Sequence, residues 1–416
     1  MKKTSVIIIL SIISIVIMTS NVLAQWDLYR LGSHITDGNP HDMTVIGDYA
    51  YIGDWDAGLT VYDVSVPIFP AFITNFDTPG LANSVLHHEN TAVVSDWSHG
   101  VSIFDVTLPY MPEFLSSYDS PGVSYASYIS GNYLYIADFI IGITVVDITD
   151  LENPLFVRSI AIGGLATGIW GQNNYFYAVS YPDGVKTFDL TDPSNPILVG
   201  NFNSPGDAFN ITGEGDKLYL CDGDVGVGIL SIATPSTPIL LNTVLTPGYA
   251  VDASLSDTVL YVADDSIGAI AYSVNDPMAY YMIASFETEN EIKGIHSADS
   301  MVYIGVDSTF IILYLTNNPV SVDDDIIEPV KFSINSIYPN PFNPEVVISF
   351  SLETTTKIKI DIFDILGRHV NTIVEGEKTE GHHSVRWNGA DYQSGVYFFR
   401  MSGDSHQQIR KAALIK

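Results

Sequence analysis

A step of 42 residues runs through most of the chain and limits the folds that it can adopt. An Asp recurs at this step in hydrophobic stretches such as TVYDV and SIFDV, at Asp63, Asp105, Asp147 and Asp189. The same register continues to Ser231 and Ser273. A second series with this step consists of Asp54, Asp96, Asp138, Ser180, Asp222 and Asp264. One supersecondary unit is therefore repeated head to tail, which indicates a repeat architecture.

Each unit has the pattern of four short β-strands. Between residues 83 and 118, the stretches NSVLHH, TAVVS, VSIFDV and EFLSSY are separated by turn residues such as Gly, Pro, Asn and Asp. Short strands punctuated in this way are typical of all-β proteins. A four-stranded unit of about 40–45 residues has the length of one propeller blade. Seven second strands and seven third strands are present, so we predict a seven-bladed β-propeller over residues 25–317.

The outer strand of the last blade is missing from the C-terminal end of the repeats. A matching segment lies at the front, because residues 28–33 stand 42 positions before the outer strand of the first unit at 70–75. We therefore expect the N-terminal strand to complete the last blade. Closing the ring in this way would remove the open sheet edges that promote aggregation. The recurring strand Asp, such as Asp147, precedes a turn sequence and is expected to cap that turn.

The repeat also resembles a known family. The stretch YLYIADFIIGITVVDITDLENP, at residues 133–154, is similar to the LVIVD repeat of bacterial and archaeal cell-surface propellers. The resemblance is clear in the first four units and weaker after Asp222, where Ser231 and Ser273 replace the strand Asp. It implies a propeller fold and a surface location, and it says little about activity.

The N-terminus has the features of an export signal. Lys2 and Lys3 precede an apolar run over residues 6–18, and small residues lead up to Ala24. We predict a signal peptide at residues 1–24 that is cleaved after Ala24. The alternative is an uncleaved anchor helix, but the apolar run is short for a membrane span and contains two Ser residues. After cleavage we expect no integral membrane span.

The propeller region is strongly acidic. Residues 25–320 contain 35 Asp and Glu but only five Lys and Arg, and the whole chain has a formal net charge of −31. Such a surface repels nucleic acids and anionic membranes, and it could attract Ca²⁺ or a basic ligand. Solubility alone is the competing explanation. The lone cysteine, Cys221, excludes an internal disulfide, and we expect it to pack in the core.

A second module follows the propeller. Residues 318–332 contain three consecutive Asp and read as an acidic linker. Residues 333–416 have nine acidic and nine basic side chains and several short strands, which predict a small, Ig-like β-sandwich.

This module resembles the type A C-terminal sorting domain of the type IX secretion system. The residues that carry the resemblance include Pro339, Asn340, Pro341, Phe342, Asn343, Pro344, Gly367, Arg368, Gly395, Lys411 and Lys416. The resemblance implies that the type IX machinery carries the protein across the outer membrane, after export to the periplasm, and places it outside the cell. An ordinary structural sandwich is the alternative, since Gly367 and Gly395 also suit turns.

A ligand site is expected at one rim of the propeller. At this rim the turn between the second and third strands of each blade, here called the second turn, lies beside the loop that enters the first strand. Acids beside aromatic rings suit sugar hydroxyls, cationic groups or Ca²⁺. The candidate rim residues are His41, Asp42, Asp54, Trp55, Asp96, Trp97, His99, Asp222, Asp224 and Asp264. The Asp that recurs in most blades is expected mainly to hold its turn, so the unrepeated residues are the stronger candidates.

The sequence contains no local signature of common enzymes. Nucleophile-elbow, zinc-protease, P-loop and dinucleotide-binding motifs are absent, and the adjacent His87 and His88 would point to opposite faces of a strand. We therefore expect a non-catalytic binding module for a glycan, peptide or surface partner, with no catalytic residue or metal ligand assigned. The alternatives are a secreted hydrolase or lyase acting on a polymer through His41, Asp42 and rim carboxylates, and a structural spacer.

Overall fold

The structure is a computed structural model that describes residues 26–298, 300–316, 332–352, 354–379, 381–403 and 406–416. The predicted signal peptide and nearly all of the predicted linker lie outside these residues. The chain forms two compact units, which divide between residues 319 and 320. Within the described ranges, no helix has the length and apolar character that crossing a bilayer requires.

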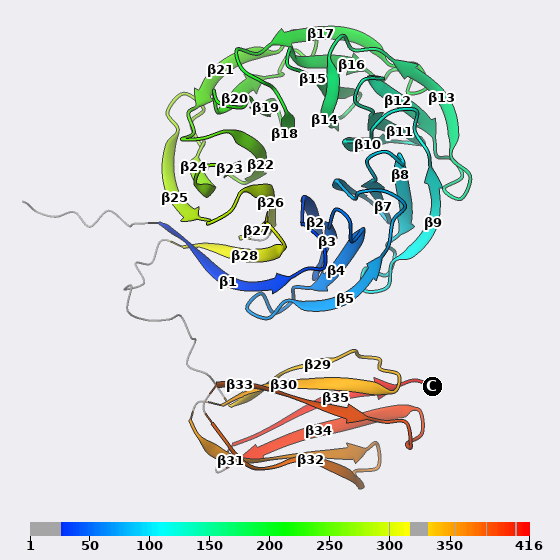
Figure 1. Cartoon of the computed structure of the whole chain (residues 1–416), viewed down its shortest axis with the longest axis vertical. Coiled ribbons are helices and arrows are strands. Elements are labelled where there is room, and N and C mark those ends of the chain that lie inside the picture. The colour runs from blue at the N-terminus through cyan, green and yellow to red at the C-terminus, as the bar shows by residue number, and fades with distance from the viewer. Residues whose placement is uncertain (1–25, 299, 317–331, 353, 380, 404–405) are drawn as a thin grey trace, which may run out of the picture. The chain divides into compact units, whose positions relative to one another are not determined.

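The first unit is a ring of seven four-stranded antiparallel sheets, which confirms the predicted propeller fold (Figure 1). Blades 1 and 2 consist of β2 (Asp42–Ile46), β3 (Tyr49–Gly53), β4 (Leu59–Asp63), β5 (Ala71–Phe76), β6 (Ser84–His88), β7 (Thr91–Ser95), β8 (Val101–Asp105) and β9 (Glu113–Tyr118). Blades 3 and 4 consist of β10 (Ala126–Ser130), β11 (Tyr133–Ala137), β12 (Ile143–Asp147), β13 (Leu155–Ile160), β14 (Leu165–Gln172), β15 (Tyr175–Tyr181), β16 (Gly184–Asp189) and β17 (Ile197–Asn203).

Three further blades complete the ring. Blades 5 and 6 consist of β18 (Asn210–Glu214), β19 (Lys217–Cys221), β20 (Val227–Ser231), β21 (Ile239–Val244), β22 (Ala250–Ser256), β23 (Val259–Asp264), β24 (Gly268–Ser273) and β25 (Tyr281–Glu287). Blade 7 consists of β26 (Ile292–Ala298), β27 (Met301–Val306), β28 (Thr309–Thr316) and the N-terminal β1 (Asp27–Ile35). The first strand of every blade faces the centre of the ring (Figure 1).

Strand β1 connects the two ends of the propeller. It pairs antiparallel with β28, from Asp27 opposite Thr316 to Ile35 opposite Thr309, with a register shift after Arg30. A Cβ atom on Gly32 would lie 2.2 Å from the main-chain oxygen of Pro67, so the chain can pass blade 1 this closely only with glycine. The N-terminal strand therefore joins blade 7 and also packs against blade 1.

The hydrophobic core of the propeller lies between neighbouring blades. One cluster contains Tyr135 and Val145 from blade 3 together with Phe176 and Phe188 from blade 4. The middle strands are buried on both faces, which explains why their sequences are nearly continuous apolar runs. Cys221 is fully buried in the cluster between blades 5 and 6, as a packing residue would be.

In blades 1 to 4 the Asp at the end of the third strand caps the following turn. Asp147 Oδ1 accepts a hydrogen bond from the backbone N–H of Thr149 at 2.8 Å, and Asp105 accepts one from Thr107 at 2.7 Å. These hydrogen bonds lower the pKa of both carboxyl groups. The side chains lie at the surface of the turns, away from the centre of the ring.

The second unit is a sandwich of two sheets. Its strands are β29 (Ser333–Tyr338), β30 (Glu345–Leu352), β31 (Thr356–Asp364), β32 (His369–Lys378), β33 (Gly381–Asn388), β34 (Gly395–Gly403) and β35 (His406–Leu414). One sheet has the order β29-β30-β33 and the other the order β32-β31-β34-β35. Phe350, Trp387 and Phe399 fill the core between the sheets. This arrangement confirms the predicted C-terminal β-sandwich.

Candidate functional site: the mouth of the propeller channel

The centre of the ring holds a cavity of about 760 Å³ that is lined by the innermost strands and their entering loops. Every blade contributes one residue from the start of its innermost strand or from the position just before it. In chain order these residues are His41, Asn83, Tyr125, Thr167, Phe209, Val251 and Lys293, and each is 42 positions after the previous one. The rim prediction concerned these same loops, and of the seven side chains its list of candidates included His41.

A continuous arc of aromatic rings lies at one side of this mouth. The His41 ring stacks on Trp55 with centroids 4.1 Å apart, and the Trp97 ring lies 5.2 Å from Trp55 in an edge-on arrangement. Tyr125 follows at 4.8 Å from Trp97, and Phe139 stacks on Tyr125 at 5.1 Å. All five side chains are half-buried. We call these five residues the aromatic arc.

The backbone of the second turn holds these rings in place. Trp55 and Trp97 both have φ 48°, and Trp55 exchanges two main-chain hydrogen bonds with Ala82 of the next blade. Gly223 forms the same bridge with Ala250 in blade 5. The turn geometry therefore does not depend on the side chain, so the chemistry at this position can differ from blade to blade.

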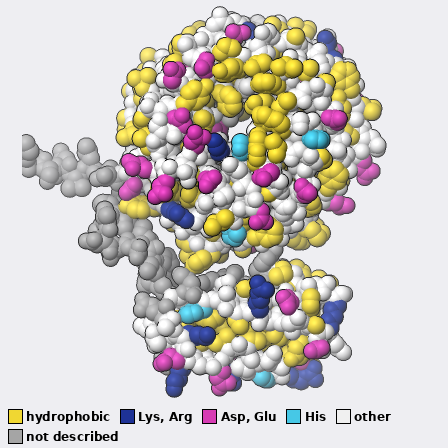
Figure 2. Space-filling model, in the orientation of Figure 1, with side chains coloured by type: hydrophobic (Ala, Val, Ile, Leu, Met, Phe, Trp, Pro, Cys, Tyr) yellow, Lys and Arg dark blue, Asp and Glu magenta, His cyan; other side chains and the backbone are white. Residues whose placement is uncertain are grey.

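This turn position changes character around the ring. It follows the repeated Asp, which is replaced by Ser180 in blade 4 and by Val306 in blade 7, and is occupied, in chain order, by Trp55, Trp97, Phe139, Tyr181, Gly223, Asp265 and Asp307. Four consecutive blades thus present aromatic side chains, and blades 6 and 7 present exposed carboxylates. Acidic side chains surround the central opening of the ring on the face seen in Figure 2. The mouth therefore has an aromatic side and an acidic side.

The repeated Asp residues lie beneath the turns and not in the mouth. Asp54, Asp96, Asp222 and Asp264 are at most 2% exposed, and none of them lines the cavity. In blade 1, Asp54 accepts hydrogen bonds from the hydroxyls of Thr36 at 2.8 Å and Thr60 at 3.1 Å. Burial raises the pKa of Asp54 to about 6. Through such hydrogen bonds, these carboxyl groups connect the segment that leads into a blade with the second turn of that blade.

Blade 5 lacks one of the hydroxyl groups that donate a hydrogen bond to the repeated Asp. In blades 1 to 3 a hydroxyl six residues after the repeated Asp donates to it, as Thr144 does to Asp138 at 2.7 Å. The equivalent residue in blade 5 is Gly228, so Asp222 Oδ2 accepts the N–H of Gly206 but has no hydroxyl donor from this position. A Cβ atom on Gly228 would meet its nearest neighbour, Leu240, at an ordinary 3.5 Å. The site therefore has room for a serine.

Replacing Gly228 with Ser is expected to stabilise the propeller by about 1 kcal/mol, because a new hydroxyl can donate to the buried Asp222 carboxylate. The measurement is the urea unfolding midpoint by tryptophan fluorescence. Gly228→Ala is the matched control, since it brings the same strand preference without the hydroxyl. Equal midpoints for the Ser and Ala variants would show that the missing hydroxyl has no energetic role.

Two further carboxyl groups connect the innermost strands across blade boundaries. Asp42 accepts hydrogen bonds from the N–H groups of Met43 in its own strand at 2.7 Å and Val85 in blade 2 at 3.0 Å. Asp252 likewise accepts from Ala253 and, at 2.9 Å, from Ile295 in blade 7.

The carboxyl groups of Asp42 and Asp252 lie at the innermost strands of the blades. The backbone N–H groups at this edge of a sheet have no neighbouring strand to pair with. Burial raises the pKa of Asp42. Burial and the charge of Asp42 raise the pKa of Asp252 to about 8.

The histidine at the mouth is neutral near pH 7. Burial, together with the nearby charge of Lys293, lowers the pKa of His41 to about 4. Burial also lowers the pKa of His296, which lines the cavity on β26, to about 4. Lys293 Nζ lies 2.6 Å from a carboxylate oxygen of Glu291. The lining of the cavity therefore contains one lysine, already paired, and three imidazoles, of which His41 and His296 are uncharged near pH 7.

The structure separates the predicted rim residues into three groups. His41, Asp42, Trp55 and Trp97 line the cavity together. His99 and Asp224 are exposed on the second turns of blades 2 and 5, outside the lining. The four repeated Asp are buried beneath those turns, as described above.

Several lining residues were not selected from the sequence. They are Phe209, Glu291 and Lys293, and all lie on or beside the entering loops. Phe209 and Lys293 keep the 42-residue spacing of His41, but the type of side chain at this position does not repeat. In the described ranges, no group of three or more His, Cys, Asp or Glu is arranged to hold a metal ion, so no calcium ligands are assigned.

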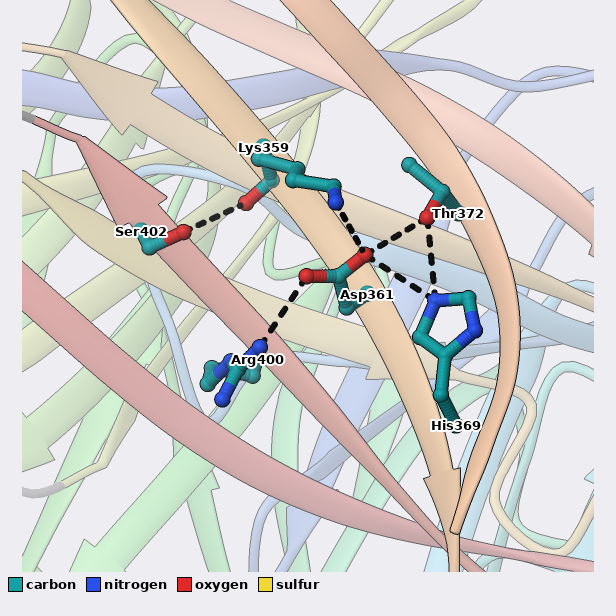
Figure 3. Close-up of polar contacts among 6 residues, drawn as sticks. All are labelled: Lys359, Asp361, His369, Thr372, Arg400 and Ser402. Atoms are coloured by element: carbon teal, nitrogen blue, oxygen red, sulfur yellow. Dashed lines mark hydrogen bonds and ion pairs between the residues drawn. The ribbon is translucent and has the colours of Figure 1, made fainter.

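In the C-terminal module, a buried carboxylate organises the outer face of the larger sheet (Figure 3). Asp361 on β31 lies 3.1 Å from Arg400 Nη2, 3.4 Å from Lys359 Nζ and 3.2 Å from His369 Nε2, and it accepts a hydrogen bond from Thr372. Burial alone would raise the pKa of Asp361, but these donors together outweigh it and lower the pKa. The cluster joins three neighbouring strands of the sheet.

The Pro-rich motif of this module binds the last strand. Phe342 is 1% exposed, its N–H donates to the Ala413 carbonyl at 2.8 Å, and its own carbonyl accepts from Ile415 at 3.0 Å. Gly367 has φ 74° in the turn where Arg368 contacts Asp364 at 2.7 Å. The sorting-motif residues at the two ends of the module are therefore joined in the fold.

Comparison with known proteins agrees with both modules. A model of the secretion system C-terminal sorting domain matches residues 336–416, and a model of the LVIVD repeat matches residues 37–78, 126–161, 163–204 and 205–246. A search of curated proteins gives no match.

Among solved structures, a crystal structure of the computationally designed Ika8 protein is similar with a TM-score of 0.51 and 11% identity, over 68% of this chain and 98% of that chain. At this identity the similarity concerns the fold alone. The chain therefore combines an LVIVD-repeat β-propeller with a type IX secretion sorting domain, which directs it to the cell surface or the extracellular space.

Proposed function

We propose that this exported protein is a non-catalytic binding module that holds an extracellular glycan, peptide or surface partner at the mouth of its propeller. The observation that supports this is the aromatic arc, in which five half-buried rings pack in sequence at the open end of the cavity. Contiguous apolar surface in a concave position is typical of binding sites. Because neighbouring rings and backbone bridges already hold the arc, a ligand would pay little to order it.

A secreted hydrolase or lyase is the second candidate, since Asp42 and Asp252 both line the cavity and both have a raised pKa. The hydrogen bonds that these two carboxyl groups accept from backbone N–H groups favour the binding role. Both oxygens of Asp252 accept backbone N–H groups, and a carboxyl group that transfers protons would have to give up such partners.

The binding proposal is tested on glycan and peptide arrays with the full chain and a Trp97→Gly variant. Glycine keeps the turn, because Gly223 makes the same backbone bridge in blade 5. We expect any ligand found to lose at least about tenfold in affinity with Trp97→Gly. The control is Tyr281→Ala, which removes a 61% exposed ring from the outer strand β25 and should leave binding unchanged.

Two results would contradict the proposal. Unchanged affinity in Trp97→Gly would place the ligand elsewhere. Turnover of a polysaccharide or ester substrate by the wild type, lost in Asp42→Asn, would establish the enzyme instead.

A further inference from the structure

We infer that the ligand at this mouth is a basic, partly apolar peptide segment in extended conformation. The inference rests on the proposed binding function and adds the chemical class of the ligand. It starts from the composition of the mouth, because the aromatic arc belongs to blades 1 to 3, whereas the corresponding turn position carries exposed carboxylates in blades 6 and 7. A ligand that spans the opening meets apolar surface at one side and negative charge at the other.

The lining of the cavity has a clear excess of acid. It includes five carboxyl groups, from Asp42, Glu214, Asp252, Asp265 and Glu291, against the single ammonium group of Lys293. Lys293 is already paired with Glu291 at 2.6 Å. Even if Asp42 and Asp252 both carry a proton, the three remaining carboxylates outnumber the single ammonium group, so the lining stays negative. An anionic ligand is therefore disfavoured, and the low-dielectric walls of the channel strengthen the attraction for a cation.

Exposed acids continue outward from the cavity around the same end of the ring. The second turns of the blades are on one side of the propeller by strand direction, and they carry Asp56, Asp183, Asp224, Asp265 and Asp307. These charges come from different blades and so are spread around the opening. A single cationic group would meet only one or two of them, whereas a segment with several basic residues can reach more.

A peptide fits this arrangement better than a neutral glycan. Side chains on one face of an extended chain repeat every two residues, about 6.6–7 Å apart, so apolar and basic residues can alternate between the arc and the acids. Lys and Arg also interact favourably with aromatic rings. A neutral sugar could stack on the arc but would gain nothing from the surrounding carboxylates.

The test uses blocked pentapeptides and the full-length secreted protein, with calorimetry at low and moderate salt. The first peptide alternates Lys and Leu, the second has Glu in place of Lys, and the third has Ser in place of Leu. We expect the first to bind at least about tenfold more tightly than either of the others, and to weaken as salt screens the charges. A glucosamine tetramer serves as a cationic probe that is not a peptide.

Matched charge variants separate the mouth from the general acidity of the propeller. The triple variant Asp56→Asn, Asp224→Asn and Asp307→Asn removes exposed acids from the second turns. The control triple variant Asp48→Asn, Glu113→Gln and Glu152→Gln removes the same charge from exposed positions at the opposite end of the strands. We expect the triple variant of the second turns to bind the Lys peptide at least about threefold more weakly than the wild type. The control triple variant should lose clearly less affinity.

The outcomes distinguish this inference from the proposed function. Equal binding of the Lys and Glu peptides, or equal loss in both triple variants, would overturn the basic-peptide class. Tighter binding of the glucosamine tetramer than of every peptide would also overturn it. In each of these cases a loss of binding in Trp97→Gly would still support a ligand site at the mouth, while no effect of Trp97→Gly would remove the site itself.

Discussion

Replacing Leu28 with Asp is expected to lower the free energy of unfolding of the propeller by about 3–5 kcal/mol, because it places an unpaired charge in the core. Leu28 is 3% exposed and packs in the cluster that joins blades 6 and 7. It also lies on the strand that closes the ring against β28. Loss of that strand would expose an unpaired sheet edge, so we also expect aggregation.

The measurement is the urea midpoint together with the elution volume in size-exclusion chromatography. The matched control is Ile35→Asp, which makes the same kind of change at the other end of β1, where the side chain is 74% exposed. That variant should stay within about 0.5 kcal/mol of the wild type. If both variants unfold at the same urea concentration, the N-terminal strand does not hold the ring together.

Asp138→Ala is the second substitution with a large expected effect. Asp138 is fully buried and accepts hydrogen bonds from the hydroxyls of Ser120 at 2.9 Å and Thr144 at 2.7 Å. Its removal leaves these buried donors without a partner, which should cost about 2–4 kcal/mol. The free energy of unfolding from urea titration measures this loss.

The control is Asp147→Ala, which belongs to the other Asp series with the same 42-residue step. Asp147 caps an exposed turn through Thr149, so its loss should change the unfolding midpoint far less than the loss of Asp138. A similar shift for the two variants would mean that the buried Asp series contributes no more than a surface cap. Asp138→Asn should be intermediate, since the amide keeps one acceptor oxygen.

The repeat spacing allowed the fold to be predicted from the sequence. Each blade buries both faces of its middle strands, so stretches such as TVYDV must stay apolar in every copy, and the turns between them must keep their Gly, Pro and Asp residues. The same constraint made the strand at residues 28–33 visible as the partner of an incomplete blade. In the structure it extends to Asp27–Ile35 and pairs with β28.

The candidate site was only partly predictable, because repetition and function leave different signals. Asp54 and Asp96 repeat since each holds a turn, and the structure places them beneath the rim. Tyr125 and Lys293 do not repeat, yet they line the mouth together with His41. Nothing in the local sequence distinguishes a lining residue from any other loop residue until the ring brings the seven loops together.

The amino-acid sequence alone was enough to establish the number of blades, the closing strand and the C-terminal sorting module, because these depend on short-range patterns of apolar and turn residues that every copy must keep. Contacts between blades decide which side chains share the mouth, which of the two Asp series is buried, and how aromatic rings and carboxylates are distributed around the opening. Such contacts join residues of different blades, such as Trp55 with Ala82 and Asp42 with Val85, and they became visible only in three dimensions.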